Sequence, residues 1–172
     1  MIYEAGEDSF LLRKYVKELV GEGEKVLELG AGSGILAEAA AENKAEVTAS
    51  DIDDEAVEFL KKKKINAVKS NLFENIKGRF DWIIFNPPYL PLDEREELES
   101  RKATTGGKKG SEILERALEN AREYLNKNGK ILIVVSSLTG NVEKLFKKFK
   151  FKFKKLEEKK EFFEKLIVYL VF

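Results

Sequence analysis

The chain has 172 residues, a length that favours one domain over residues 1–172, and its 31 basic and 31 acidic side chains give a formal net charge of zero. Neither cysteine nor histidine occurs, which excludes disulfides, Cys/His zinc sites, catalytic cysteines and histidine-based acid–base chemistry. The apolar runs are far shorter than the roughly 20 residues of a membrane span, and no signal-peptide pattern opens the chain, so we expect a cytoplasmic protein.

The N-terminal half alternates amphipathic helices with short apolar strands. We expect a first helix at 7–20, capped by Asp8 or Ser9, a second that ends near Glu42, and a third capped by Asp53. The strands expected in this half lie at 25–29, 46–51, 66–70 and 80–85.

A polar, charged loop is expected at roughly 93–109. The helix after it is expected to run from Ser111 to about Asn126, with Gly129 as its terminator. A fifth strand at 130–137 and a short helix near 141–149 follow.

The last two predicted elements are both strands. The segment FKFKFKKL (149–156) alternates apolar and charged residues with period two, which is typical of a half-exposed strand. A closing strand lies at 164–172, and no helix fits between the two, so we expect them to pair as antiparallel neighbours.

The pattern predicts an α/β fold: a doubly wound, mostly parallel seven-stranded sheet with an antiparallel last strand, in three α/β/α layers. Ligands of such sheets bind outside the carboxyl ends of the strands. Those ends are expected at Gly30, Asp51, Asn71, Asn86 and Ser136, and the most unusual local chemistry of the sequence lies at four of them.

The first strand runs into LELGAGSG, where Gly30, Gly32 and Gly34 allow the backbone to turn sharply and to approach a ligand closely. The following helix presents free N–H groups and the positive end of its dipole. A dinucleotide or S-adenosylmethionine could use this arrangement. The spacing G-x-G-x-G, with Ile35 where the dinucleotide pattern has glycine, argues against NAD.

Two acidic residues accompany the glycine loop. Glu28, inside the first strand, would repel a pyrophosphate but would suit the ammonium of a methionine moiety, directly or through water. Asp51, at the end of the second strand, can accept hydrogen bonds from both ribose hydroxyls. A glycine-rich turn that only links strand to helix is the alternative interpretation.

All three prolines of the chain lie in FNPPYLP, directly after the apolar strand at 80–85. Proline restricts the residue before it to extended conformations and has no amide donor. The Pro87 carbonyl and the Asn86 side-chain oxygen therefore offer two fixed acceptors, and Tyr89 supplies an aromatic face. A rigid proline turn with Tyr89 packed nearby is the simpler alternative, and Trp82, in mid-strand, is expected in the core.

Two acceptors beside an aromatic ring suit a planar NH2 group whose lone pair is delocalised into a carbonyl or a ring. Hydrogen bonds to both N–H protons hold such a nitrogen in line with a methyl donor and stabilise the positive charge that it gains. A sulfonium methyl is already activated, so this chemistry needs no histidine base.

Together, LELGAGSG, ASDID and FNPPY resemble a class I, Rossmann-like S-adenosylmethionine-dependent methyltransferase of the NPPY type. More narrowly, YEAGEDSFLL (3–12) and TGGKKGSEIL (105–114) resemble the small archaeal and eukaryotic HemK-like enzymes. Those enzymes methylate the glutamine side-chain nitrogen in the GGQ motif of class I peptide chain release factors. The resemblance covers nearly the whole chain and implies S-adenosylmethionine as cofactor, a release factor as substrate and no metal.

The resemblance also implies roles for individual residues. The implied cofactor-binding residues are Ser9, Glu28, Gly30, Ala31, Gly32, Gly34, Asp51, Ile52, Asn71, Leu72 and Asn86. The implied substrate-binding residues are Asn86, Pro87, Pro88 and Tyr89. Of these, Asn86, Pro87 and Tyr89 are the implied catalytic residues.

Small members of this family often work with a zinc-binding activator subunit docked near the exposed third strand. The resemblance therefore implies that residues 65–68 contribute to the interface of a heterodimer.

Other functions remain open at the level of the sequence. An N6-adenine or N2-guanine methyltransferase acting on RNA or DNA would share these motifs, although the neutral charge makes nucleic acid a poor match. The lysines between Lys144 and Lys165 could still form a local basic patch. A cofactor-binding subunit that has lost activity would not need an intact Asn-Pro-Pro-Tyr, and a lysine substrate has little use for two acceptors aimed at a planar NH2.

Overall fold

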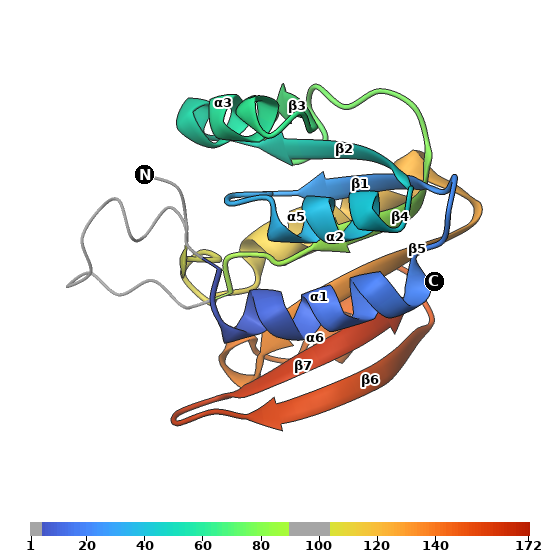
Figure 1. Cartoon of the computed structure of the whole chain (residues 1–172). Helices are drawn as coiled ribbons and strands as arrows, with labels where there is room; N and C mark the ends of the chain where they lie inside the picture. The colour runs from blue at the N-terminus through green and yellow to red at the C-terminus, as the bar shows by residue number, and fades with distance from the viewer. Residues whose placement is uncertain (1–4, 90–103) are drawn as a thin grey trace.

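The computed structural model describes residues 5–89 and 104–172, which form one seven-stranded sheet with helices on both faces (Figure 1). The strand order is β3-β2-β1-β4-β5-β7-β6. The strands are β1 (Lys25–Leu29), β2 (Glu46–Asp51), β3 (Asn66–Lys69), β4 (Phe80–Phe85), β5 (Leu125–Ser136), β6 (Phe153–Lys160) and β7 (Lys165–Val171). The helices are α1 (Glu7–Leu19), α2 (Ile35–Glu42), α3 (Asp54–Lys62), α5 (Glu112–Ala121) and α6 (Val142–Lys148), with 3-10 turns η1 (Arg122–Tyr124) and η2 (Ser137–Thr139).

The pairing confirms the predicted fold class. Strands β1 to β5 pair in parallel, whereas β7 runs antiparallel to both β5 and β6. In the register, Leu29 of β1 lies beside Ser50 of β2 and Phe85 of β4. The residues that follow these three strands therefore meet at one edge of the sheet.

The two faces of the sheet are covered by different helices, as the alternation of side chains along a strand requires. Leu27 and Leu29 of β1 pack in a cluster with α5 and α6, whereas Val26 packs with α1 and α2. Trp82 is buried with the second cluster, as expected, and its ring nitrogen donates to the Glu24 carboxylate at 2.7 Å.

The prediction for α5 was wrong at its C-terminal end. The helix stops at Ala121, because Tyr124 stacks on Phe73 with ring centroids 4.5 Å apart and turns the chain toward the sheet. Strand β5 already begins at Leu125, with a register shift against β4. Gly129 lies in that irregular stretch, where a Cβ atom would come within 2.9 Å of the Phe80 carbonyl oxygen, so it serves close packing and not helix termination.

Two further expectations need correction. The N-cap of α1 is Gly6, and neither Asp8 nor Ser9 caps the helix, because both side chains lie inside its first turn and are buried. Strand β6 begins at Phe153, since Phe149 is still the C-cap of α6. The Asp53 cap of α3 is confirmed: its side chain accepts from the Glu55 amide at 2.9 Å.

Candidate active site

The glycine loop after β1 has a backbone that only glycine adopts without strain. Gly30, Gly32 and Gly34 have φ angles of 63°, 50° and 78°. A Cβ atom on Gly34 would lie 2.4 Å from a methyl group of Leu60, so the turn into α2 also requires the absence of a side chain. The amide of Ala31 donates to the Ser50 carbonyl at 2.9 Å, which holds the loop against the end of β2.

Asp51, the last residue of β2, fixes the same loop through its carboxylate. One oxygen accepts from the Gly32 amide at 2.8 Å and the other from the Asp53 amide at 2.9 Å. Each oxygen can accept a further hydrogen bond. The next residue, Ile52, is 63% exposed, which is unusual for a large apolar side chain at the end of a buried strand.

Glu28 lies beneath the loop and is almost completely buried. One of its oxygens accepts from the Ala37 amide in the first turn of α2 at 2.8 Å. Burial raises the pKa of this carboxyl group to about 8, the bond from Ala37 opposes the shift, and the nearby Asp51 charge adds to it. A cationic group bound beside Glu28 would favour its ionised form.

Asn86 follows β4 at the same edge of the sheet and is held by α1. Its amide nitrogen donates to the Ser9 hydroxyl at 3.1 Å. The Asn86 side-chain oxygen is buried and has no hydrogen-bond partner among the residues that the structure describes. An unpaired buried acceptor costs about 1–3 kcal/mol, so it is a candidate contact for a ligand N–H.

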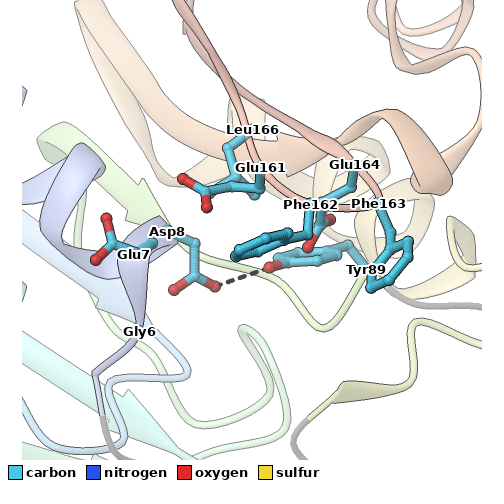
Figure 2. Close-up of a pocket in the computed structure, with 9 residues that line it drawn as sticks. All are labelled: Gly6, Glu7, Asp8, Tyr89, Glu161, Phe162, Phe163, Glu164 and Leu166. Carbon is cyan, nitrogen blue, oxygen red and sulfur yellow. Dashed lines mark hydrogen bonds between the residues drawn. The ribbon is translucent and has the colours of Figure 1, made fainter.

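Tyr89 is anchored to the same turn of α1. Its hydroxyl donates to the Asp8 carboxylate at 3.0 Å (Figure 2). The other oxygen of Asp8 accepts from the Ser9 amide at 2.6 Å. The first turn of α1 therefore holds both polar side chains of the Asn-Pro-Pro-Tyr segment. The sequence had suggested only a capping role for Asp8, because its partner lies 81 residues away.

A second contact that the sequence did not reveal holds the two prolines. Pro87 is buried and Pro88 is half-buried. Gly106 packs so closely that a Cβ atom there would lie 2.5 Å from the Pro88 carbonyl oxygen and 2.1 Å from that of Gly110. The glycine pair in TGGKKG was the available signal, since close approach of two backbones is a reason for glycine.

Asn71 and Leu72 lie in the turn after β3. Asn71 donates to the Glu74 carboxylate at 2.9 Å, and Leu72 has a φ angle of 52°, which is uncommon for a leucine. The Leu72 carbonyl accepts from the Ser70 hydroxyl at 2.8 Å, which stabilises this conformation. The turn thus has a defined shape at the end of β3, next to the end of β2.

Within residues 5–89 and 104–172, no group of three or more acidic side chains is arranged so that it could hold a metal ion. No helix in the same residues is long and apolar enough to cross a membrane.

The sheet order with antiparallel β7, the glycine loop after β1 and the acidic end of β2 define a Rossmann-like, S-adenosylmethionine-dependent methyltransferase. Comparison with known proteins agrees with this class. The family model of the methyltransferase small domain matches residues 7–164, and the chain belongs to this family.

Relatives of this chain include proteins named for glutamine methylation. A Methanocaldococcus jannaschii protein, provisionally named as a protein N5-glutamine methyltransferase, is 42% identical over 155 residues, 85% of this chain and 78% of that protein. The release factor glutamine methyltransferase of Streptococcus pneumoniae is 33% identical over 139 residues, 72% of this chain, which spans only 50% of that protein.

Among solved structures, the E. cuniculi Mtq2–Trm112 complex, described as responsible for methylation of the eRF1 translation termination factor, matches with a TM-score of 0.82. The match covers 99% of this chain and 97% of that one. At 22% identity, this likeness shows the fold.

Proposed function

We propose that the chain transfers a methyl group from S-adenosylmethionine to the side-chain amide nitrogen (N5) of glutamine in the GGQ motif of a class I peptide chain release factor. The observation that carries the proposal is the Asn86 oxygen, which is buried, has no hydrogen-bond partner in the described part of the chain and is held in place through Ser9. The names of the two relatives above, both of which refer to glutamine methylation, support a side-chain amide nitrogen as the atom that receives the methyl group.

The residues at the sheet edge fit the cofactor. The segment from Gly30 to Gly34 presents little side-chain bulk to a nucleoside, since three of its residues are glycines with positive φ angles, Ala31 is buried, and Ser33 is small and half-exposed. Asp51 retains a lone pair on each oxygen for the ribose hydroxyls, and exposed Ile52 offers an apolar surface to the adenine. When bound, the cofactor supplies an activated sulfonium methyl group.

Further residues complete the proposed cofactor site. Asn71 and Leu72 border the adenine from the turn after β3, and Leu72 is held there by its bond from Ser70. Glu28 lies under the glycine loop, where its carboxylate would balance the ammonium of the methionine part. Ser9 reaches the same end of the cofactor from α1 and orients Asn86.

The Asn-Pro-Pro-Tyr segment would orient the substrate. The Asn86 oxygen and the Pro87 carbonyl accept the two N–H protons of the glutamine amide, which fixes the plane of the amide and directs its nitrogen lone pair. Both acceptors also stabilise the positive charge that develops on this nitrogen. Pro88 and Tyr89 form the wall of the pocket, with Tyr89 anchored through Asp8.

The direct test is incubation with S-adenosylmethionine labelled in its methyl group and, separately, release factor, tRNA, rRNA or DNA. We expect label in the release factor, at the glutamine of GGQ. Label only in nucleic acid would show that the chain is an amino-base methyltransferase and would overturn the proposal.

The role of Asn86 has its own test. Asn86→Ala should reduce methyl transfer about a hundredfold to a thousandfold, the range typical of a removed transition-state hydrogen bond. Binding of the cofactor, measured by calorimetry, should change little. Transfer near the wild-type rate would show that Asn86 does not orient the substrate.

The proposal includes a small zinc-binding activator subunit, which would dock at residues 65–68. Strand β3 is the edge of the sheet next to β2, so one side of its backbone is free to bind another chain. Val68 is only half-buried there. Co-expression followed by gel filtration should give one heterodimer peak with raised activity, whereas two separate peaks with unchanged activity would contradict this role.

A further inference from the structure

A pocket of about 310 Å³ opens beside Tyr89, between the first turn of α1 and the turn that joins β6 to β7 (Figure 2). Tyr89 lies three residues after Asn86, and its hydroxyl is bonded to Asp8 in the wall of the pocket. The pocket is therefore continuous with the segment proposed to hold the substrate glutamine.

The far wall of the pocket carries two aromatic side chains that pack against almost nothing. Phe162 is 97% exposed and Phe163 is 94% exposed, with their ring centroids 6.5 Å apart. Neighbouring exposed aromatic residues of this kind mark an interaction surface, because they contribute nothing to the core of the protein itself. The turn is short and joins two paired strands, so it presents both rings on a firm support.

The remaining polar lining is acidic. Glu7 and Asp8 come from α1, and Glu161 and Glu164 come from the turn. The described lining residues include no lysine or arginine, and Lys159, outside this lining, pairs with both Glu7 and Glu161.

Two of these carboxylates lack a cationic partner among the described residues. Asp8 bonds to the Tyr89 hydroxyl and the Ser9 amide, both of which are neutral donors. One oxygen of Glu164 is buried and has no hydrogen-bond partner at all among the described residues. The pocket therefore keeps an excess of negative charge and an unused acceptor next to the exposed rings.

We propose that this pocket, which we name the hairpin pocket, docks a lysine- or arginine-containing segment of the substrate protein next to the methylated glutamine. The aliphatic parts of that segment lie on Phe162 and Phe163, and its cationic group binds among the carboxylates, with Glu164 as an acceptor. The inference rests on the proposed function and adds to it how the substrate is recognised beyond the glutamine.

The charge of the pocket selects this occupant over a nucleic acid. A phosphate backbone placed beside Tyr89 would face the carboxylates of Glu7, Asp8, Glu161 and Glu164, and the described lining of the pocket has no lysine or arginine to offset them, which is repulsive. A cationic peptide gains attraction at the same place, and its side-chain stems cover apolar surface while the charge reaches the carboxylates. A second copy of this chain that paired through the same pocket is a less suitable occupant, because it would place the same carboxylates opposite each other.

Two variants test the hairpin pocket with the labelled-methyl assay on intact release factor. Phe162→Ala/Phe163→Ala and Glu161→Gln/Glu164→Gln should each raise the KM for release factor about tenfold, which corresponds to about 1.4 kcal/mol of binding, and leave kcat nearly unchanged. The KM of the wild type should also rise more steeply with salt concentration than the KM of the Glu161→Gln/Glu164→Gln variant. Phe172→Ala and Glu119→Gln/Glu123→Gln are matched controls, because these side chains are exposed and lie outside the pocket.

The outcomes separate this inference from the function on which it rests. Methylation of release factor by the wild type, with an unchanged KM in both pocket variants, would overturn the docking role alone. Label only in nucleic acid would overturn both. If gel filtration showed a dimer that Phe162→Ala/Phe163→Ala converts to a monomer without a change in KM, the rings would serve an interface between copies and the inference would be wrong.

Discussion

Asp8 and Ser9 show how two adjacent side chains can define the position of a distant loop. Their oxygens accept from Tyr89 and Asn86, which lie 81 and 77 residues further along the chain. The acceptor geometry of the proposed active site therefore depends on α1 as much as on β4. Buried hydrogen bonds of this kind hold the loop in place, because leaving a buried polar group without its partner would cost about 1–3 kcal/mol of stability.

The Asp8–Tyr89 bond gives a prediction at this scale. Tyr89→Phe removes the hydroxyl that donates to the buried Asp8 carboxylate. One carboxylate oxygen then loses this hydrogen bond, and we expect the aromatic ring to lose its fixed position. The value of kcat/KM for release factor should fall about tenfold to a hundredfold, in line with the cost of one unpaired buried acceptor.

Tyr15→Phe is the matched control for this variant. The Tyr15 hydroxyl also donates to a carboxylate, that of Glu157 at 2.7 Å, and neither residue belongs to the proposed cofactor or substrate site. Both variants should lose some thermal stability, but only Tyr89→Phe should lose activity. Equal kcat/KM values for the two would show that the hydroxyl of Tyr89 serves stability alone.

At the scale of the elements, patterns local to one segment were predicted well, and patterns decided by contacts were not. The strand at 25–29 and the Asp53 cap of α3 depend on neighbours in sequence, and both were correct. The end of α5 depends on Tyr124 stacking on Phe73, a residue some fifty positions earlier, which periodicity cannot show. Gly129 was assigned to the wrong element for the same reason.

The contact between Gly34, the N-cap of α2, and Leu60 of α3 gives a prediction at this scale. Gly34→Ala places a methyl group in a left-handed backbone conformation and 2.4 Å from a methyl carbon of fully buried Leu60. The backbone alone costs about 1–2 kcal/mol, and the overlap adds about 1–3 kcal/mol because the fully buried Leu60 side chain must shift to relieve it. Chemical denaturation should therefore show a loss of about 2–5 kcal/mol.

Gly78→Ala separates the two contributions. Gly78 has a φ angle of 89°, but nothing lies within 4 Å of the position that its Cβ atom would occupy. This variant should lose only the backbone cost of about 1–2 kcal/mol. If both variants lost the same stability, the contact between Gly34 and Leu60 would contribute nothing.

For the whole molecule, the sequence predicted the sheet and the edge at which its chemistry gathers, because both follow from the order of elements along the chain. The mostly parallel sheet with antiparallel β7 was confirmed. The sequence did not predict the Asp8–Tyr89 hydrogen bond or the close approach of Gly106 to Pro88, since each contact joins segments that meet only after folding.

The stability of the molecule should depend on pH through Glu28. Burial raises its pKa in the folded state to about 8 from an ordinary value of 4.5, so between these two pH values the folded protein binds a proton that the unfolded chain does not. This contribution is fully present below about pH 4.5 and is lost as the pH rises to about 8. The loss is at most about 5 kcal/mol.

Glu28→Gln isolates this contribution, because glutamine has nearly the same shape and does not titrate. The amide oxygen can still accept from Ala37, and every other carboxyl group is unchanged. We therefore expect the difference in unfolding free energy, wild type minus variant, to decrease from pH 5 to pH 8, measured by urea denaturation at several pH values. A constant difference would mean that Glu28 is ionised in the folded protein across this range. Bound S-adenosylmethionine should make the unfolding free energy of the wild type depend less on pH. Its ammonium beside Glu28 favours the carboxylate, so the folded protein with cofactor would no longer carry the extra proton on Glu28.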